Sequence, residues 1–377
     1  MTITAIRTRA VAVPVDQPTR MSNRELNVRH YLLVEVTTAD GHSGVGYAYA
    51  GTGAGLLAKL ALDDLLAPVY LGADENDVAG LWERAYQETL LEGRRGTVIR
   101  ALSALDIALW DLRAARAGLP LASFLGGSTD PLPAYASGGY YRPGEGSWTE
   151  AVVREIEFNA AQGFTDHKIK VGGLSIPEDA RRVAAAVETI GDTGRLALDA
   201  NNAYRSAAEA RTAIQAFERA AGDRPLWWFE EPLSPESIAG HAELSRTIRT
   251  PVATGEIHQT RWEFRPLIEA SIPILQCDAG VAGGVTEWLR IASTAATFGL
   301  HMAPHWHHNL HVHLCAAIPN ALVVEYFAAE KGIYNFERLL TPESRLHYSG
   351  NQLHIPDRPG LGITFDPEMV TKYELMG

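Results

Sequence analysis

Eight short apolar runs recur between residues 132 and 326, and Ala-rich amphipathic stretches such as 178–189 and 207–220 separate them. This alternation is typical of parallel βα units, and eight such units close into a (β/α)8 barrel. A doubly wound sheet would alternate in the same way, but it gives no reason for acids at the ends of three successive strands. We therefore predict a barrel of the TIM type, whose strands are PAYAS, HKIKV, LALDA, WWFEE, PVATG, ILQCD, HMAPH and LVVEY.

The first third of the chain follows a different pattern. Residues 5–13, 31–38 and 43–48 alternate like strands, and Asp40-Gly41 forms a turn between the last two, which predicts a small antiparallel sheet. A helix follows, because apolar side chains recur at steps of three and four between Ile99 and Leu112, and Gly118 with Pro120 supplies a stop signal. The 377 residues also exceed what one barrel needs.

Composition narrows the class of protein. Apolar residues make up 46% and charged residues 21%, which fits a globular chain with a large core. The net charge of −12 argues against a nucleic-acid partner, and an anionic substrate would need a local positive centre. No apolar run is long enough for a membrane span, and the first residues lack the core of a signal peptide, so we expect a cytoplasmic protein.

Cys277 and Cys315 lack metal-site spacing and are expected to be buried, reduced thiols.

Three acids define a candidate metal site. Asp199, Glu230 and Glu256 lie at the ends of successive apolar runs, at the barrel end that carries active sites. Three converging carboxylates would repel one another unless a cation neutralised them. Ligation by oxygen alone favours Mg²⁺, with Mn²⁺ as a substitute. Each acid taken alone could instead be a helix cap or a solvated loop residue.

Lys168 and Lys170 occupy the run before Asp199. Side chains alternate along a strand, so both amines point to the same side, and the interior of the barrel would bring them close to the acids. Like charge lowers the pKa of a lysine, which would let one amine act as a base. The alternative is a basic pair on the protein surface.

The stretch MAPHWHHNLHVHL is rich in histidine. A zinc site is one interpretation of such a tract, but the three carboxylates already supply a metal site made of hard oxygen ligands. His305 at the strand end is better explained as an acid/base group, since Asp278 from the preceding strand would fix its tautomer.

The motifs KIK, LDANN, FEEP, TGE, QCDAG, APH and VEY, in this order, resemble the mandelate racemase subgroup of the enolase superfamily over essentially the whole chain. The resemblance implies a capping domain (1–125), the barrel (126–328) and a C-terminal segment (329–377) that returns to the cap. It also implies a homo-oligomer. The resemblance implies that Asp199, Glu230 and Glu256 are the Mg²⁺ ligands. It implies that Lys170 is the base on one face of the substrate, that the His305–Asp278 dyad serves the opposite face, and that Lys168 stabilises the enolate. It also implies that a protonated Glu325 donates to the enolate and that Asn201 contacts the metal-bound groups or the substrate.

Several reactions share this machinery. A dehydratase that removes water from an aldonate or aldarate, giving a 2-keto-3-deoxy product, is the function we predict, because the cap segments 16–31 and 47–55 have a composition suited to a polyol. A racemase or epimerase of a 2-hydroxy acid is the alternative. Cycloisomerases of the muconate type usually carry lysine at the position of His305, and a non-catalytic sugar-acid binding protein would lose the bases. The polar and aromatic residues of these cap segments are Arg20, Asn23, Arg24, Asn27, Arg29, His30, Tyr47 and Tyr49.

Overall fold

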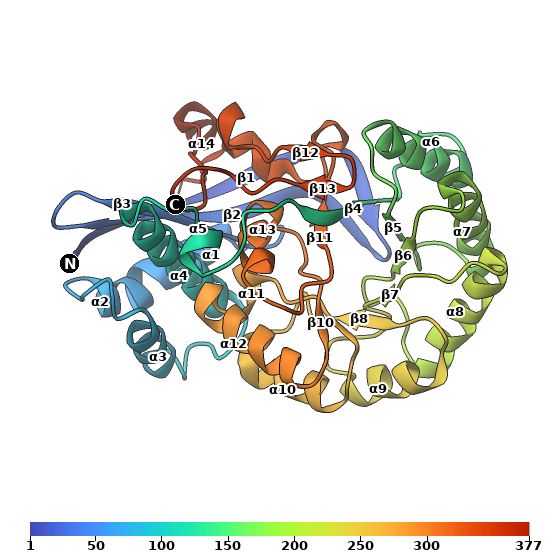
Figure 1. Cartoon of the computed structure of the whole chain (residues 1–377), viewed down its shortest axis with the longest axis horizontal. Coiled ribbons are helices and arrows are strands. Elements are labelled where there is room, and N and C mark those ends of the chain that lie inside the picture. Colours follow the sequence, from blue (N-terminus) through green and yellow to red (C-terminus); the bar gives the residue numbers. More distant parts are fainter. Residues whose placement is uncertain (377) are drawn as a thin grey trace.

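A computed structural model describes residues 1–376 and shows a barrel beside a smaller cap (Figure 1). The predicted barrel fold is confirmed: parallel neighbours run in the order β10-β9-β8-β7-β6-β5-β4, and β11 pairs with β4. Backbone hydrogen bonds from Met302 to Asn320 and from Leu322 to Met302 close the ring between β10 and the segment before β11. The strands are β4 (Leu132–Gly138), β5 (His167–Lys170), β6 (Leu196–Asp199), β7 (Phe229–Glu230), β8 (Val252–Thr254), β9 (Ile274–Leu275), β10 (His301–Met302) and β11 (Val324–Tyr326).

Helices cover the outside of the barrel. The amphipathic stretches expected at 178–189 and 207–220 form α7 (Ile176–Ile190) and α8 (Ala207–Ala221). Ser147 and Ser175 begin their helices with reciprocal capping boxes to Glu150 and Glu178, which satisfy the free backbone N–H groups of the first turn. The other helices are α6 (Trp148–Ala161), α9 (Ile238–Thr247), α10 (Thr260–Glu269), α11 (Ala279–Ala282), α12 (Gly284–Thr297) and α13 (His308–Ala316).

The cap sheet has the order β1-β2-β3 and is antiparallel, as predicted. Its first two strands, β1 (Ile3–Met21) and β2 (Arg24–Thr38), are longer than expected, and β3 spans Ser43–Tyr49. The segment 16–31 is therefore not a loop but the end of a β-hairpin. Its tip is held at the barrel because Arg20 and Tyr141 exchange backbone hydrogen bonds.

One long buried helix, α4 (Thr97–Arg116), packs along β3. The close approach requires glycine, since a Cβ on Gly44 or Gly46 would collide with the backbone of that helix. The remaining cap helices are α1 (Gly55–Ala61), a π-helical turn (Leu62–Leu66), α2 (Ala67–Tyr70), α3 (Val78–Glu88) and α5 (Leu121–Phe124).

The C-terminal segment runs back along the cap sheet (Figure 1). Asn335 donates to the carbonyl of Val13 and accepts from the Tyr31 hydroxyl, and Leu375 donates to the carbonyl of Ala10. Its elements are 3-10 helices at Ala329–Lys331, Asn335–Leu339 and Pro342–Ser344, strands β12 (Tyr348–Ser349) and β13 (Gln352–Leu353), and α14 (Pro367–Tyr373).

The interior of the barrel is plugged by a small apolar cluster that includes Tyr135, Ala197 and Trp228. The polar side chains at the strand ends are therefore confined to the mouth. Among the helices of residues 1–376, none is both long enough and apolar enough to cross a membrane.

Candidate active site at the carboxyl end of the barrel

Three carboxylates from neighbouring strands converge at the mouth of the barrel. Asp199 ends β6, Glu230 ends β7, and Glu256 follows β8. Each offers an oxygen, and these atoms all lie within 4.8 Å of one another. Asp199 and Glu230 are fully buried, and Glu256 Oε2 has no hydrogen-bond partner. Burial and the neighbouring Asp199 carboxylate raise the pKa of Glu230. A set of buried, mutually repelling oxygens fits a small divalent cation.

Both lysines of β5 point into the barrel at these acids. The Lys168 ammonium lies 2.6 Å from Glu230 Oε1, and Lys170 is hydrogen-bonded to Asp199. Lys168 is 1% exposed and lies below the mouth, whereas Lys170 reaches the open cavity. The register of a single short strand thus delivers two amines to one carboxylate cluster.

The expected fall in lysine pKa is not what this arrangement produces. Burial does oppose the charged form of Lys170, but the Asp199 carboxylate outweighs it, and the pKa of Lys170 is raised. Burial of Lys168 is likewise outweighed, by Glu230 and Glu325, and its pKa is raised. The like charge of the two amines would lower both pKa values, but the carboxylates that contact the amines have the larger effect.

Glu325 on β11 also differs from expectation. Its Oε1 lies 2.7 Å from the Lys168 ammonium, and its Oε2 accepts a hydrogen bond of 2.6 Å from the backbone of Trp306. Burial favours the protonated carboxyl, but the Lys168 charge outweighs it and the pKa of Glu325 is lowered. In this arrangement Glu325 is an ionised partner of Lys168 and not a protonated donor.

On the other side of the mouth, His305 follows β10 and Asp278 caps α11. His305 Nδ1 lies 3.0 Å from Asp278 Oδ2, while His305 Nε2 lies 3.7 Å from Glu256 Oε2. Asp278 also accepts a hydrogen bond from the Gly280 backbone, which fixes the carboxylate. Burial disfavours a charged imidazole, but Glu256 and Asp278 outweigh it and raise the pKa of His305 to about 9.

Other histidines of the tract are buried and bonded within the protein, away from the acidic triad. His308 Nε2 lies 3.0 Å from Glu337 Oε1, and His311 Nε2 accepts from the backbone of Ala279. Burial lowers the pKa of His311 to about 4. Within residues 1–376, the acidic triad is the one group of metal-binding side chains that could share an ion. The tract does not form the zinc site considered above.

A cavity of about 470 Å³ lies between the cap and these groups, within the usual range for a small-molecule site. Asn201 lies at its edge, and the Asn201 Oδ1 atom has no partner. Asn201, Asn202 and Glu231 all adopt positive φ, a strained conformation that turns the strand-end loops toward the cavity. The wall is formed by Met21, Arg24, Glu25, Arg29, Tyr49, Gly51, Thr52, Arg100, Tyr140, Lys170, Asn201, Asn202, Glu231, Glu256, Ile257, Val281, His305 and Trp306.

Of the cap residues singled out in the sequence, only some reach this cavity. Arg24, Arg29 and Tyr49 line it. Arg20 instead donates to the Gly173 carbonyl, and Tyr47 is buried against Phe336.

Several cavity residues were not predicted from the sequence, and Arg100 and Glu231 are charged residues among them. Arg100 belongs to α4, where it is a lone charge among apolar side chains near the helix start, and that interruption was an available signal. Glu231 is fully buried, and neither of its carboxylate oxygens has a partner. It directly follows the candidate ligand Glu230, and the sequence alone could not show which way it points.

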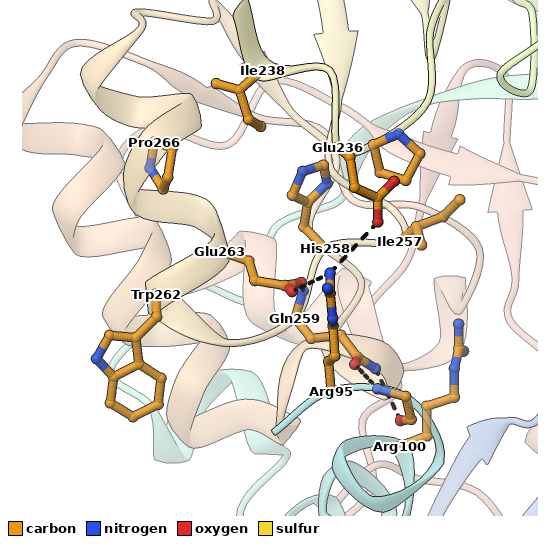
Figure 2. Close-up of a pocket in the computed structure, with 12 residues that line it drawn as sticks. Arg95, Arg100, Glu236, Ile238, Ile257, His258, Gln259, Trp262, Glu263 and Pro266 are labelled. Carbon is orange, nitrogen blue, oxygen red and sulfur yellow. Dashed lines mark hydrogen bonds and ion pairs between the residues drawn. The ribbon is translucent and has the colours of Figure 1, made fainter. Parts of the chain in front are cut away.

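A second pocket of about 450 Å³ adjoins this cavity between the cap and α9 and α10. Figure 2 shows Arg95 between Glu236 and Glu263, at 3.5 and 3.2 Å, with Arg100 apart from both acids. Gln259 ties the start of α4 to the barrel through Gly96 and Val281. The charges of this pocket compensate one another.

A capped (β/α)8 barrel with an acidic triad between an amine and an imidazole defines a class of barrel enzymes that use a divalent metal. Comparison with known families is more specific. A profile described as "Enolase C-terminal domain-like" matches residues 151–369, and the N-terminal domain profile of mandelate racemase/muconate lactonizing enzyme matches 3–126. The chain belongs to this family of the enolase superfamily, and it is an enzyme.

Individual relatives cover nearly the whole chain. L-talarate/galactarate dehydratase of Salmonella typhimurium is 33% identical over 95% of this chain and 86% of its own length. The 3,6-anhydro-alpha-L-galactonate cycloisomerase of Streptomyces coelicolor is 30% identical over 97% and 98%. Among solved structures, a racemase from Streptomyces coelicolor with bound magnesium has a TM-score of 0.90 at 28% identity, and the match covers 99% of this chain and 100% of that one.

Proposed function

We propose that this enzyme removes the proton next to the carboxylate of an acid sugar and then eliminates water from the neighbouring carbon, giving a 2-keto-3-deoxy acid. The observation that carries the proposal is the placement of the acidic triad between two proton-transfer groups. Lys170 contacts Asp199 at one end of the triad, and His305 lies beside Glu256 at the other. In the ring of strands, β5 and β10 are well separated, so the two groups face the cavity from different sides.

Asp199, Glu230 and Glu256 would hold Mg²⁺, the ion named for the racemase structure above. When bound, the ion acts as a Lewis acid on the substrate carboxylate and lowers the cost of negative charge there. The same position makes it the local positive centre that the net charge of −12 does not supply. Mn²⁺ prefers similar oxygen ligands and would substitute.

Proton transfer is assigned to this chain's own groups. Lys170 takes the α-proton as the free amine, and a bound cation would favour that form by neutralising the Asp199 carboxylate that otherwise raises the pKa of Lys170. The electrons of the C–H bond pass into the carboxylate-conjugated system. His305 gives its proton to the β-hydroxyl as the C–O bond breaks, so the oxygen leaves as water. The enol that remains takes up a proton at the β-carbon and loses its hydroxyl proton, which gives the 2-keto-3-deoxy acid. Asp278 holds the imidazole in position. A positioned acid or base contributes about 10² to 10⁴ in rate.

Supporting residues complete the site. Lys168 places a fixed ammonium beneath the triad, and Glu325 keeps that side chain in place. Preorganised charge of this kind stabilises a developing anion without rearrangement. Asn201 is proposed to bind a substrate hydroxyl, since its Oδ1 is free at the cavity wall.

The alternative is a racemase or epimerase, in which His305 returns a proton to the α-carbon from its own side. The same two-sided geometry favours this second function, and relatives with both kinds of name match the chain. In that reaction the β-hydroxyl stays in place.

The test is a screen of mono- and diacid sugars with Mg²⁺ in D₂O, followed by NMR. The proposal predicts a 2-keto-3-deoxy product from at least one acid. Inversion at the α-carbon without loss of water would instead establish the racemase. Lys170→Ala should abolish α-exchange at one face and His305→Asn at the other, and full activity in both variants would contradict the two-sided mechanism.

A further inference from the structure

The cap wall of the active-site cavity carries an excess of positive charge. Arg24, Arg29 and Arg100 line it, with Glu25 as the acid that the cap contributes. Within residues 1–376, none of these three arginines forms an ion pair. Arg24 donates only a long hydrogen bond to Asn202, and Arg100 donates to the backbone carbonyl of Tyr49.

Arg29 is the most confined of the three. It is 3% exposed, and its guanidinium carbon lies 4.1 Å from the ring centre of Trp306. One terminal nitrogen donates to the Tyr49 hydroxyl at 3.3 Å, but Nε and the other terminal nitrogen have no partner. Contact with an aromatic face offsets part of the cost of burying the charge, but it does not satisfy those donors.

Arg182 offers a comparison, because its Nε also has no partner but its guanidinium does have an anion beside it. Arg182 is as buried as Arg29, and it pairs with Asp179 at 2.9 Å and donates to two backbone carbonyls. Arg95 lies just before the start of α4, which contains Arg100, and has two carboxylates beside it (Figure 2). A buried guanidinium without an anion is costly, and Arg29 is one of the residues that line the ligand cavity.

We propose that Arg29, together with Arg24 and Arg100, binds a second anionic group at the far end of the substrate, so that among acid sugars the enzyme selects aldarates, which carry two carboxylates, over aldonates. This inference rests on the proposed function. The triad receives one carboxylate at the barrel end, and the cap arginines receive the other. A planar guanidinium matches a carboxylate in two parallel hydrogen bonds, whereas a terminal hydroxyl would leave the charge of Arg29 uncompensated.

The position of Arg29 also links the distal group to the chemistry. Arg29 packs on Trp306, the residue that follows His305, and Trp306 donates its backbone N–H to Glu325. A diacid that engages Arg29 is thereby anchored beside the acid/base side of the cavity. Orientation by a remote charge of this kind improves the alignment of the reacting carbon with both proton-transfer groups.

The first test compares acids of matched configuration with Mg²⁺: galactarate with galactonate, and glucarate with gluconate. The expected result is a kcat/KM for a diacid that exceeds that of its monoacid partner by about 30-fold or more, the range for a buried charge pair. A monoacid turned over as well as its diacid overturns the inference while leaving the dehydratase in place. 6-Phosphogluconate is the third probe, and its preference over glucarate would overturn the assignment to a carboxylate.

The second test uses Arg29→Gln with Arg95→Gln as the matched control, since Arg95 is exposed and already paired. Arg29→Gln should lower kcat/KM for the diacid more than for the monoacid and so remove most of the diacid preference, and Arg95→Gln should keep the preference. Because Arg29 lacks an anion, Arg29→Gln should also leave the melting temperature of the ligand-free protein unchanged or higher. An equal loss with both acids, or a lowered melting temperature, would show a structural role and contradict the proposal.

Calorimetric binding to the Lys170→Ala protein with Mg²⁺ separates the two proposals. Galactarate and glucarate should bind more tightly than galactonate and gluconate even when no turnover occurs. Failure of every sugar acid to give a 2-keto product would defeat the proposed function, and the binding comparison would still decide the role of Arg29. Equal binding of the diacid and the monoacid in each pair would overturn the proposed role of Arg29.

Discussion

His305 Nδ1 lies 3.0 Å from Asp278 Oδ2, although the two residues belong to consecutive strand-end loops 27 positions apart in the chain. Asp278 is fully buried and is further fixed by the backbone N–H of Gly280, so the imidazole can adopt one orientation. Burial disfavours ionisation of Asp278, but His307 and His305 outweigh it and lower its pKa to about 2. A fixed carboxylate of this kind holds the proton of His305 on Nδ1 and leaves Nε2 for the substrate.

The first prediction concerns this pair. Asp278→Asn should lower kcat by about 10² to 10⁴, because an amide cannot stabilise the charged imidazole, while the helix cap to Gly280 is retained. Exchange of the α-proton through Lys170 should continue in D₂O. NMR of product formation and of exchange in the same sample checks both, and an unchanged kcat would show that the dyad has no role in elimination.

The second prediction concerns the metal. Removal of divalent ions with EDTA should abolish turnover, and Mg²⁺ at 100 times its dissociation constant should stabilise the fold by about 2.7 kcal/mol. Glu256→Gln should weaken that stabilisation, since Glu256 Oε2 is a free oxygen of the triad. Glu243→Gln is the control, because Glu243 is paired with Arg211 on the surface. Thermal unfolding with and without Mg²⁺ measures the shift in melting temperature, and equal shifts in both variants would show that Glu256 does not bind the metal.

The third prediction concerns pH and stability. Asp106 in α4 is buried and bonded to the backbone and hydroxyl of Thr286, and burial raises its pKa to about 7 against these hydrogen bonds. Arg290 lowers this pKa and Glu287 raises it, both more weakly. The folded protein thus holds a proton here that the unfolded chain releases above about pH 4. The contribution is fully present below pH 4 and is lost as pH rises through about 7.

Asp106→Asn should remove this part of the pH dependence. Denaturant unfolding at pH 5 and pH 8 measures the loss of unfolding free energy in both proteins. Between pH 5 and pH 8, the unfolding free energy of the native protein should fall by more than that of the variant. Parallel losses would show that Asp106 is ionised in the folded state throughout the range.

Much of the architecture followed from the sequence, because periodicity and strand-end polarity are local properties. All eight expected strands exist, and the acids, lysines and His305 meet at one end because parallel strands share a direction. The ion pairs did not follow from the sequence. Lys168 meets Glu230 and Glu325 only after β11 has paired with β4 and the barrel has closed, and those contacts decide its pKa.

The cap was less predictable for a related reason. Residues 16–31 include many polar side chains, yet the hairpin forms because β1 and β2 pair again from Thr19 to Met21, beyond a break in register, and the barrel supports the tip through Tyr141. The pairing is irregular between Pro14 and Thr19, which lies between the Val13–Arg29 pair and the tip of the hairpin. A one-residue shift in register reverses every side chain, so sequence alone could not assign Arg29 to the wall.

The fourth prediction concerns the joint between the cap and the C-terminal segment. Asp111 of α4 is buried and accepts hydrogen bonds from Val45 of β3, at 2.7 Å, and from Leu361, at 2.6 Å. One carboxylate thereby joins three segments that are distant in the chain. Asp111→Ala leaves two N–H groups without an acceptor, each at about 1 to 3 kcal/mol, so we expect the unfolding free energy to fall by about 2 to 6 kcal/mol.

Asp111→Asn separates the hydrogen bonds from the packing. The amide oxygen can accept from only one of the two N–H groups at good geometry, and the NH₂ group would face the other donor, so this variant should also be destabilised. Asp366→Asn is the control, since Asp366 caps α14 in the same C-terminal segment and an amide oxygen can still accept from Glu368. Denaturant unfolding at pH 8, where the carboxyl of Asp111 is ionised because its pKa is raised by burial only to about 6, gives the comparison. Equal stability of Asp111→Ala and the native protein would mean that the C-terminal segment is held to the cap by its apolar contacts alone.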